Sequence, residues 1–142
     1  MSFDIKLDNG DIVFSPEGEL QTVDGLEKLK QEVAKVLLTE IGSNVYHPWY
    51  GSTLTDDVVG FATDVRITTR NSEATINEAL ENIAALQVQQ RSFQRVTPQE
   101  SIGAIKEVKV VKDPADPRSW LVSVTVLSRA LTEVTEEFNI AF

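Results

Sequence analysis

The sequence predicts an α+β fold with an N-terminal β-hairpin, two main helices and a C-terminal antiparallel β-meander in one domain. Three observations support this prediction. An Asn-Gly pair lies between alternating apolar residues near the N-terminus, two helical repeats of apolar residues follow, and three segments rich in β-branched residues end the chain. A length of 142 residues is typical of one domain, so we expect residues 1–142 to form a single unit.

The segment FDIKLDNGDIVF predicts the hairpin, because its Asn-Gly pair supplies the two positive-φ residues of a type I′ turn. A two-residue loop places Leu7 opposite Ile12 and Ile5 opposite Phe14, so these four side chains share one face. SPEGEL is a second turn signal, and LQTV after it is expected to add a short third strand.

The first long helix is predicted over 24–41, with Asp24 as its N-cap and Gly42 at the left-handed C′ position. Its apolar stripe consists of Leu26, Leu29, Val33, Val36, Leu37 and Ile41. After an aromatic loop, TDDVVGFA predicts one short helix that carries Val58, Val59 and Phe61 inward.

The second long helix is predicted over 71–90, capped by Asn71 or Ser72. Apolar residues recur on its successive turns at Ile76, Leu80, Ile83 and Leu86, with Gln87 as the alternative last position. The segment TPQE has the form of a capping box with proline at the first helical position, which predicts a brief helical turn.

Three strands are predicted in AIKEVKVVKD, SWLVSVTVLS and LTEVTEEFNIAF, with PADPR as the turn between the first two. In the middle strand, Trp120, Val122 and Val124 lie on one face, and apolar residues such as Leu121 occur on the other. We therefore expect this strand to be central and covered on both sides.

The charge of the chain limits its partners. There are 13 Lys plus Arg against 22 Asp plus Glu, a net charge of −9, which repels phosphate backbones and anionic lipid at long range. We expect neither nucleic acid nor a membrane as a partner, and neither a signal peptide nor an 18-residue apolar run is seen. The lack of cysteine excludes disulfides and thiolate chemistry and fits a cytosolic product.

Few residues offer catalytic or cofactor chemistry. His47 is the only histidine, and no carboxylate near it has ligand spacing, so no metal is expected. The chain has no G-x-G-x-x-G, Walker A or G-x-S-x-G motif, so neither a cofactor nor a serine nucleophile is expected. Carboxylate pairs remain as the alternative, because two acids can hydrolyse glycosides. The candidate pairs are Glu27 with Glu40, Asp56 with Asp57, and Glu136 with Glu137.

The first helix and the loop after it carry an ordered set of residues that follows the patterns G-x-x-x-L-x-Q, L-x-T-x-x-G and P-x-Y-G-S. The set comprises Gly25, Leu26, Leu29, Gln31, Leu37, Thr39, Gly42, Pro48, Tyr50, Gly51 and Ser52. It resembles the baseplate wedge and sheath-initiator family of contractile phage tails, sometimes labelled lysozyme-like. The resemblance is good over about residues 11–54 and looser beyond.

This resemblance implies a non-enzymatic structural protein of the virion, made in the host cytoplasm and located in the inner tail baseplate with six-fold symmetry. Its implied partners are wedge proteins, the tail tube or hub, and the tail sheath, which extends strands of such proteins. Many relatives carry Glu-Pro-Arg after the second helix for the wedge contact. Here the region reads QRSFQRVTPQES, where Arg91 or Arg95 could serve as the arginine but the Glu-Pro half is missing.

For the sheath contact, the resemblance together with the terminal position of the last strands points to 119–128 and 131–140. The residues that we assign to this contact are Trp120, Val122, Val124, Glu133, Thr135 and Glu137. The alternative role of the glutamates is to keep an exposed β-edge soluble.

The aromatic loop has a packing interpretation and a binding interpretation. Pro48 and Gly51 are expected to fix a turn, Gly51 with positive φ or tight packing, while the rings of Tyr46, Trp49 and Tyr50 cover the end of the helix. The alternative is that the rings contact a partner directly, since exposed aromatic residues are enriched at interfaces.

Overall fold

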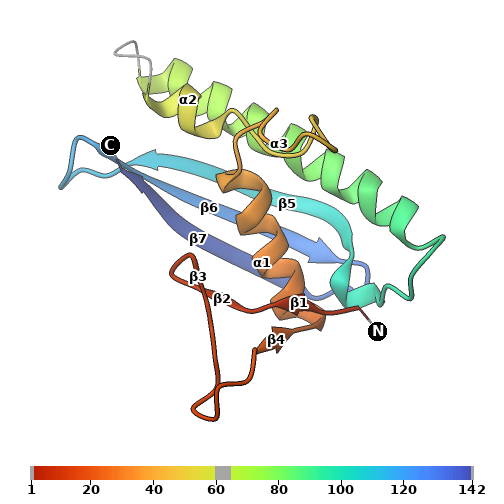
Figure 1. The fold of residues 1–142 in the computed structure, drawn as a ribbon. Helices are drawn as coiled ribbons and strands as arrows, with labels where there is room; N and C mark the ends of the chain where they lie inside the picture. Colours follow the sequence, from red (N-terminus) through yellow and green to blue (C-terminus); the bar gives the residue numbers. More distant parts are fainter. Residues whose placement is uncertain (1, 60–64, 142) are drawn as a thin grey trace.

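The structure is a computed structural model that describes residues 2–59 and 65–141, and it confirms the predicted α+β class (Figure 1). In chain order the elements are β1 (Asp4–Ile5), β2 (Leu7–Asp8), β3 (Asp11–Ile12), β4 (Thr22–Val23), α1 (Gly25–Leu38), α2 (Leu54–Val59), α3 (Val65–Gln90), a 3₁₀ turn (Pro98–Glu100), β5 (Ile102–Lys112), β6 (Ser119–Ser128) and β7 (Glu133–Ala141). Across the described residues, no helix has the length and apolar character that a membrane span requires.

The C-terminal meander forms an antiparallel sheet in the order β5–β6–β7. Helix α1 crosses one face of this sheet, and α3 runs along its β5 side (Figure 1). One core lies between the helices and that face, because the helical and strand periodicities both direct apolar side chains there. Its most buried members include Leu29, Val33, Leu37, Ile76, Leu80, Ile83, Val110, Val122, Val124 and Val126.

The opposite face of the sheet is open, so the prediction that β6 is covered on both sides is wrong for this chain. Leu121 on β6 is 41% exposed and its neighbour Val111 on β5 is 54% exposed. Both long helices pack against the face that carries Trp120, Val122 and Val124. The apolar residues on the outer face are therefore exposed to solvent, and most of their neighbours on that face are polar.

The N-terminal hairpin is confirmed at its tip and differs at its base. Residues 9 and 10 have φ values of 50° and 82°, and Leu7 pairs with Ile12 as predicted. Ile5, however, pairs with Thr22 of β4, and Phe14 forms a bridge with Leu20. The second turn explains the difference, because it reverses the chain soon after β3 and brings β4 beside β1.

Helix α1 ends at Leu38, three residues before the predicted end. Thr39 is extended, and its carbonyl accepts a hydrogen bond of 2.9 Å from the N–H of Ser52, so the chain leaves the helix to pair with a distant segment. Gly42 does have positive φ, but it lies in the loop and is not the C′ residue. Asp24 occupies the N-cap position without a side-chain hydrogen bond to the helix.

Helix α3 begins at Val65, before the predicted cap at Asn71 or Ser72. Ser72 is fully buried inside the helix, which shows tertiary packing overriding a residue type that usually favours helix ends. The short helix α2 was predicted, and its anchor is the fully buried Leu54. Phe61 and the side chains of Val58 and Val59 lie outside the described residues.

A buried glutamine joins both long helices to the start of the sheet. Gln87 is on the predicted core face of α3, and its Nε2 donates to Glu32 Oε2 at 3.0 Å and to the Glu100 carbonyl at 3.2 Å. Its Oε1 accepts from the N–H of Ile102 at 2.7 Å. Since each of these bonds spans different elements, the Gln87 amide fixes how α1, α3 and β5 meet.

We predict that Gln87→Ala lowers the free energy of unfolding by about 2–4 kcal/mol, because it leaves several buried polar groups without partners. Gln89→Ala is the matched control, since Gln89 is exposed two residues further along the same helix. Urea denaturation measures both. Equal small losses for the two variants would show that the Gln87 network contributes little.

Candidate functional site

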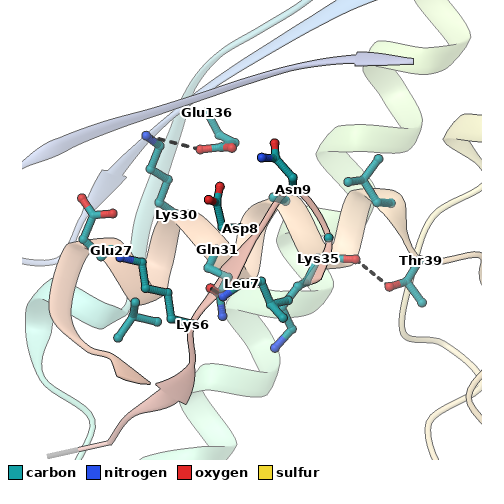
Figure 2. Close-up of a pocket in the computed structure, with 14 residues that line it drawn as sticks. Lys6, Leu7, Asp8, Asn9, Glu27, Lys30, Gln31, Lys35, Thr39 and Glu136 are labelled. Atoms are coloured by element: carbon teal, nitrogen blue, oxygen red, sulfur yellow. Dashed lines mark hydrogen bonds and ion pairs between the residues drawn. The ribbon is translucent and has the colours of Figure 1, made fainter. Parts of the chain in front are cut away.

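A groove of about 590 Å³ lies between the N-terminal hairpin, α1 and β7 (Figure 2). The hairpin side is formed by residues 6–10, and α1 forms the floor. The polar side chains that line it include Lys6, Asp8, Asn9, Glu27, Lys30, Gln31, Lys35, Thr39 and Glu136. Both signs of charge are present, so the groove is suited to polar or charged groups of a partner.

Gln31 holds the hairpin side of the groove against α1. Its Oε1 accepts a hydrogen bond from the N–H of Leu7 at 2.9 Å, and its Nε2 donates to the carbonyl of Ile5 at 2.7 Å and to Asp4 Oδ2 at 3.0 Å. These bonds satisfy backbone groups between two short strands, where the ladder is interrupted. The glutamine of the G-x-x-x-L-x-Q pattern therefore has a structural role.

An ion pair supports the same junction. Lys35 Nζ lies 2.7 Å from Asp4 Oδ2. Burial alone would raise the pKa of Asp4, but the hydrogen bond and charge of Lys35, together with the Gln31 amide, outweigh burial and hold that pKa below its ordinary value. The carboxylate is thus charged at neutral pH and helps to fix the hairpin on α1.

Glu136, which was a candidate acid together with Glu137, lies in this groove. It lies on the inner, core-facing side of β7, where its carboxylate is 3.6 Å from Lys30 Nζ of α1 (Figure 2). Burial raises the pKa of Glu136 above its ordinary value, against the opposing charge of Lys30. The sequence did contain a signal for this position, because residue 136 has the same parity in the strand as the buried Val134 and Ile140.

Two of the three candidate acid pairs are not brought together. Glu27 lies in the first turn of α1 and Glu40 lies beyond its C-terminal end, so roughly 15 Å or more of helix separates them. Glu136 and Glu137 point to opposite faces of β7. Asp56 is exposed, and the side chain of Asp57 lies outside the described residues. Instead, the fold places Glu27 and Glu136 in one groove, where the charge of Glu27 also raises the pKa of Glu136.

The residues of the P-x-Y-G-S pattern lock the loop after α1. Ser52 Oγ donates to the Leu37 carbonyl at 2.7 Å, and the N–H of Gly42 donates to the Pro48 carbonyl at 3.0 Å. Gly51 has a φ of 119°, as expected for a positive-φ position. A Cβ there would lie 2.6 Å from the carbonyl oxygen of Thr39. Only glycine fits at position 51, because the backbone of residues 39–41 lies against it.

The aromatic residues of this loop divide between packing and exposure. Tyr50 is half-buried against the core, and burial, followed by the charges of Glu32 and Asp4, raises its pKa to about 12. Tyr46, in contrast, is 90% exposed, and Trp49 is 38% exposed with its ring 5.6 Å from that of His47. The packing interpretation is thus confirmed for Tyr50 and wrong for Tyr46.

The residues assigned to partner contacts differ in accessibility. Trp120, Val122 and Val124 are buried in the central strand, so their side chains are not available to a partner. The exposed outer face of β7 carries Glu133, Thr135 and Glu137, and exposed Arg91 and Arg95 follow the end of α3. Among the described residues, no cluster of His, Asp and Glu is arranged to hold a metal ion.

Strand β7 has a free edge, and its hydrogen-bonding groups can be assigned. The N–H of Ser128 donates to the carbonyl of Thr132, which marks that pair as hydrogen-bonded. Opposed pairs alternate in an antiparallel ladder, and the register is continuous from this turn to residue 141. Even-numbered residues of β7 therefore bond to β6, and the backbone groups of Glu133, Thr135, Glu137 and Asn139 point outward.

We predict that Gly51→Ala destabilises the protein by roughly 3 kcal/mol or more, because the new methyl group collides with backbone that cannot move aside. Gly42→Ala is the control, since its φ of 84° is also positive but nothing lies within 4 Å of a Cβ there. That variant should lose about 1 kcal/mol. Equal losses in thermal or urea unfolding would exclude the steric explanation.

The raised pKa of Glu136 predicts that the difference in free energy of unfolding between wild type and Glu136→Gln depends on pH. The folded pKa of Glu136 is raised, so this carboxyl contributes most stability below its unfolded pKa, about 4.3, and loses that contribution as pH rises through the folded pKa. Glu136→Gln should therefore unfold at higher urea concentration than wild type at pH 7, and the advantage should shrink below pH 4. Glu137→Gln, on the exposed face, is the control. An advantage that grows on acidification would contradict the assignment.

Comparisons with known proteins give a similarity of fold to solved structures. No protein-family model matches the sequence, and no curated protein sequence matches it. Among solved structures, the chain is similar to a protein from Geobacter sulfurreducens described as a "putative tail lysozyme", with a TM-score of 0.59 and 18% identity. The similarity covers 82% of this chain and 89% of the other. At that identity the two proteins are shown to share their fold.

Proposed function

We propose that this protein is a structural component of a contractile tail baseplate that joins wedge proteins and initiates assembly of the tail sheath. Two independent lines support a role in a tail. The ordered set from Gly25 to Ser52 resembles the wedge and sheath-initiator family, and the protein with a similar fold is described as a "putative tail lysozyme". The proposed location is the virion baseplate, in a six-fold arrangement around the tail tube or hub.

The observation that carries the proposal is the free edge of β7. At alternate positions along β7, the backbone N–H and C=O groups of Glu133, Thr135, Glu137 and Asn139 point outward. No strand of the described chain pairs with these groups. Such an edge can be extended by a strand of another chain. Glu133 forms an ion pair with Lys106 of β5, so the exposed Glu137 is the edge charge that discourages pairing between two acidic copies, whereas a sheath strand with basic residues is compatible.

The wedge contact is proposed at the exposed segment after α3, where Arg91 and Arg95 lie close to each other in sequence. Guanidinium groups bind carboxylates in a bidentate manner, so an acidic group on a wedge protein is the expected partner. The missing Glu-Pro half means that this contact is formed by the arginines without the conformation that a proline would impose.

A glycan hydrolase is the second candidate, because the groove is lined by three acids, Asp8, Glu27 and Glu136, and the pKa of Glu136 is raised. In that mechanism Glu136 would be the general acid and Glu27 the second carboxylate. The pairing of Glu136 with Lys30 argues against it, since an ammonium group favours the charged carboxylate and so weakens a general acid. Release of soluble muropeptides from cell walls that disappears in Glu136→Gln would favour this candidate over assembly.

We predict that Thr135→Pro folds normally but fails to nucleate sheath. The lost N–H points outward, so no ladder bond to β6 is broken, while the added strand loses one bond and meets the proline ring. Thr135→Ala is the control, because it removes the side-chain contact with Thr125 and keeps the N–H. Sheath formation on baseplates would be scored by electron microscopy, and the fold by circular dichroism. Normal sheath on folded Thr135→Pro would exclude strand addition at β7.

A further inference from the structure

The N-terminal arm, residues 2–23, exposes an apolar face. Strand alternation and the pairs Leu7–Ile12 and Phe14–Leu20 place its larger apolar side chains on one side. Their exposed fractions lie between 37% and 70%. They are Phe3, Ile5, Leu7, Ile12, Phe14 and Leu20. Six exposed large apolar side chains within 22 residues form a cluster, whereas an ordinary protein surface carries exposed apolar residues singly.

Most of this face lies on the side of the arm opposite its contacts with α1, whereas Leu7 also lines the groove beside α1. Asp4, which has the opposite parity in the strand, reaches Lys35 and Gln31 on α1, and Val23 opposite it is half-buried. The arm is thus fixed on α1 through one side and presents the apolar residues through the other. A fixed, pre-organised surface loses little conformational entropy when it binds.

The arm is also strongly acidic around the apolar face. Residues 2–23 contain five acids and one lysine. Only Asp4 among these acids has a salt bridge in the described part of the chain. Asp8 lies directly opposite Asp11 across the hairpin, an arrangement of like charges that weakens a strand pair. The unpaired carboxylates are therefore free to meet cations on another molecule.

We propose that the apolar face of the arm docks on another protein whose surface carries an apolar strip flanked by lysines or arginines. Charge complementarity selects this occupant. A second copy of the chain would bring the same acids together, and an anionic membrane or nucleic acid would be repelled. The surface is separate from the β7 edge and from Arg91 and Arg95, so the proposal does not depend on strand addition or on membership of a tail.

The test uses the full chain, co-expressed with the proteins encoded beside its gene. Phe14→p-benzoylphenylalanine places a photo-crosslinker on the arm, and Val111→p-benzoylphenylalanine places one at a similarly exposed position on the sheet. We expect the Phe14 probe to crosslink to one other protein, at an apolar segment flanked by Lys or Arg, and the Val111 probe not to do so. Crosslinks to a second copy alone, to a segment without basic residues, or to no protein would overturn the proposal.

Binding of the purified partner then tests the two chemical components separately. Ile12→Ser with Phe14→Ser should weaken the Kd at least tenfold while leaving the melting temperature nearly unchanged, because both side chains are already exposed. Asp8→Asn with Asp11→Asn should weaken binding and reduce its dependence on salt concentration. An unchanged Kd in the first variant, or an unchanged salt dependence in the second, would contradict the proposed partner chemistry.

Discussion

The packing of α1 across the inner face of the β5–β6–β7 sheet is the constraint on which the rest of the structure depends. Its buried side, formed around Leu29, Val33 and Leu37, closes the core. Its opposite side holds the N-terminal arm through Gln31 and forms the floor of the groove. Its end fixes the loop through Thr39. A shift of α1 would therefore disturb the core, the arm, the groove and the loop together.

Local signals in the sequence predicted much of this fold. The Asn-Gly turn set the register of Leu7 with Ile12, because a two-residue loop permits only one pairing. The stripe of α1 and the β-branched strands identified the core, since helical and strand periods direct side chains to one face. The positive φ or tight packing of Gly51 was predicted from the turn that it occupies. The structure adds that a Cβ at this position would collide with the backbone of Thr39.

The errors occurred where distant segments decide the outcome. Ile5 was predicted opposite Phe14, but β4 occupies that place. Helix α1 stops at Leu38 because Ser52, 14 residues later, pairs with Thr39. Glu27 and Glu136 were each named as candidates with other partners, and their common groove was missed because tertiary packing brings them to it. No local pattern distinguishes Glu136 from Glu137 except strand parity. The exposure of Tyr46 also depends on the loop path, which composition does not encode.

The proposed function depends most directly on the outward backbone groups of β7, and hydrogen exchange at single-residue resolution measures them. In the free protein, the amides of Glu133, Thr135, Glu137 and Asn139 should exchange rapidly, while those of Val134, Glu136 and Phe138 are protected by bonds to β6. On addition of sheath subunits, the odd-numbered amides should become protected and the even-numbered ones should not change. Odd-numbered amides that remain unprotected in the sheath-bound protein would contradict the account.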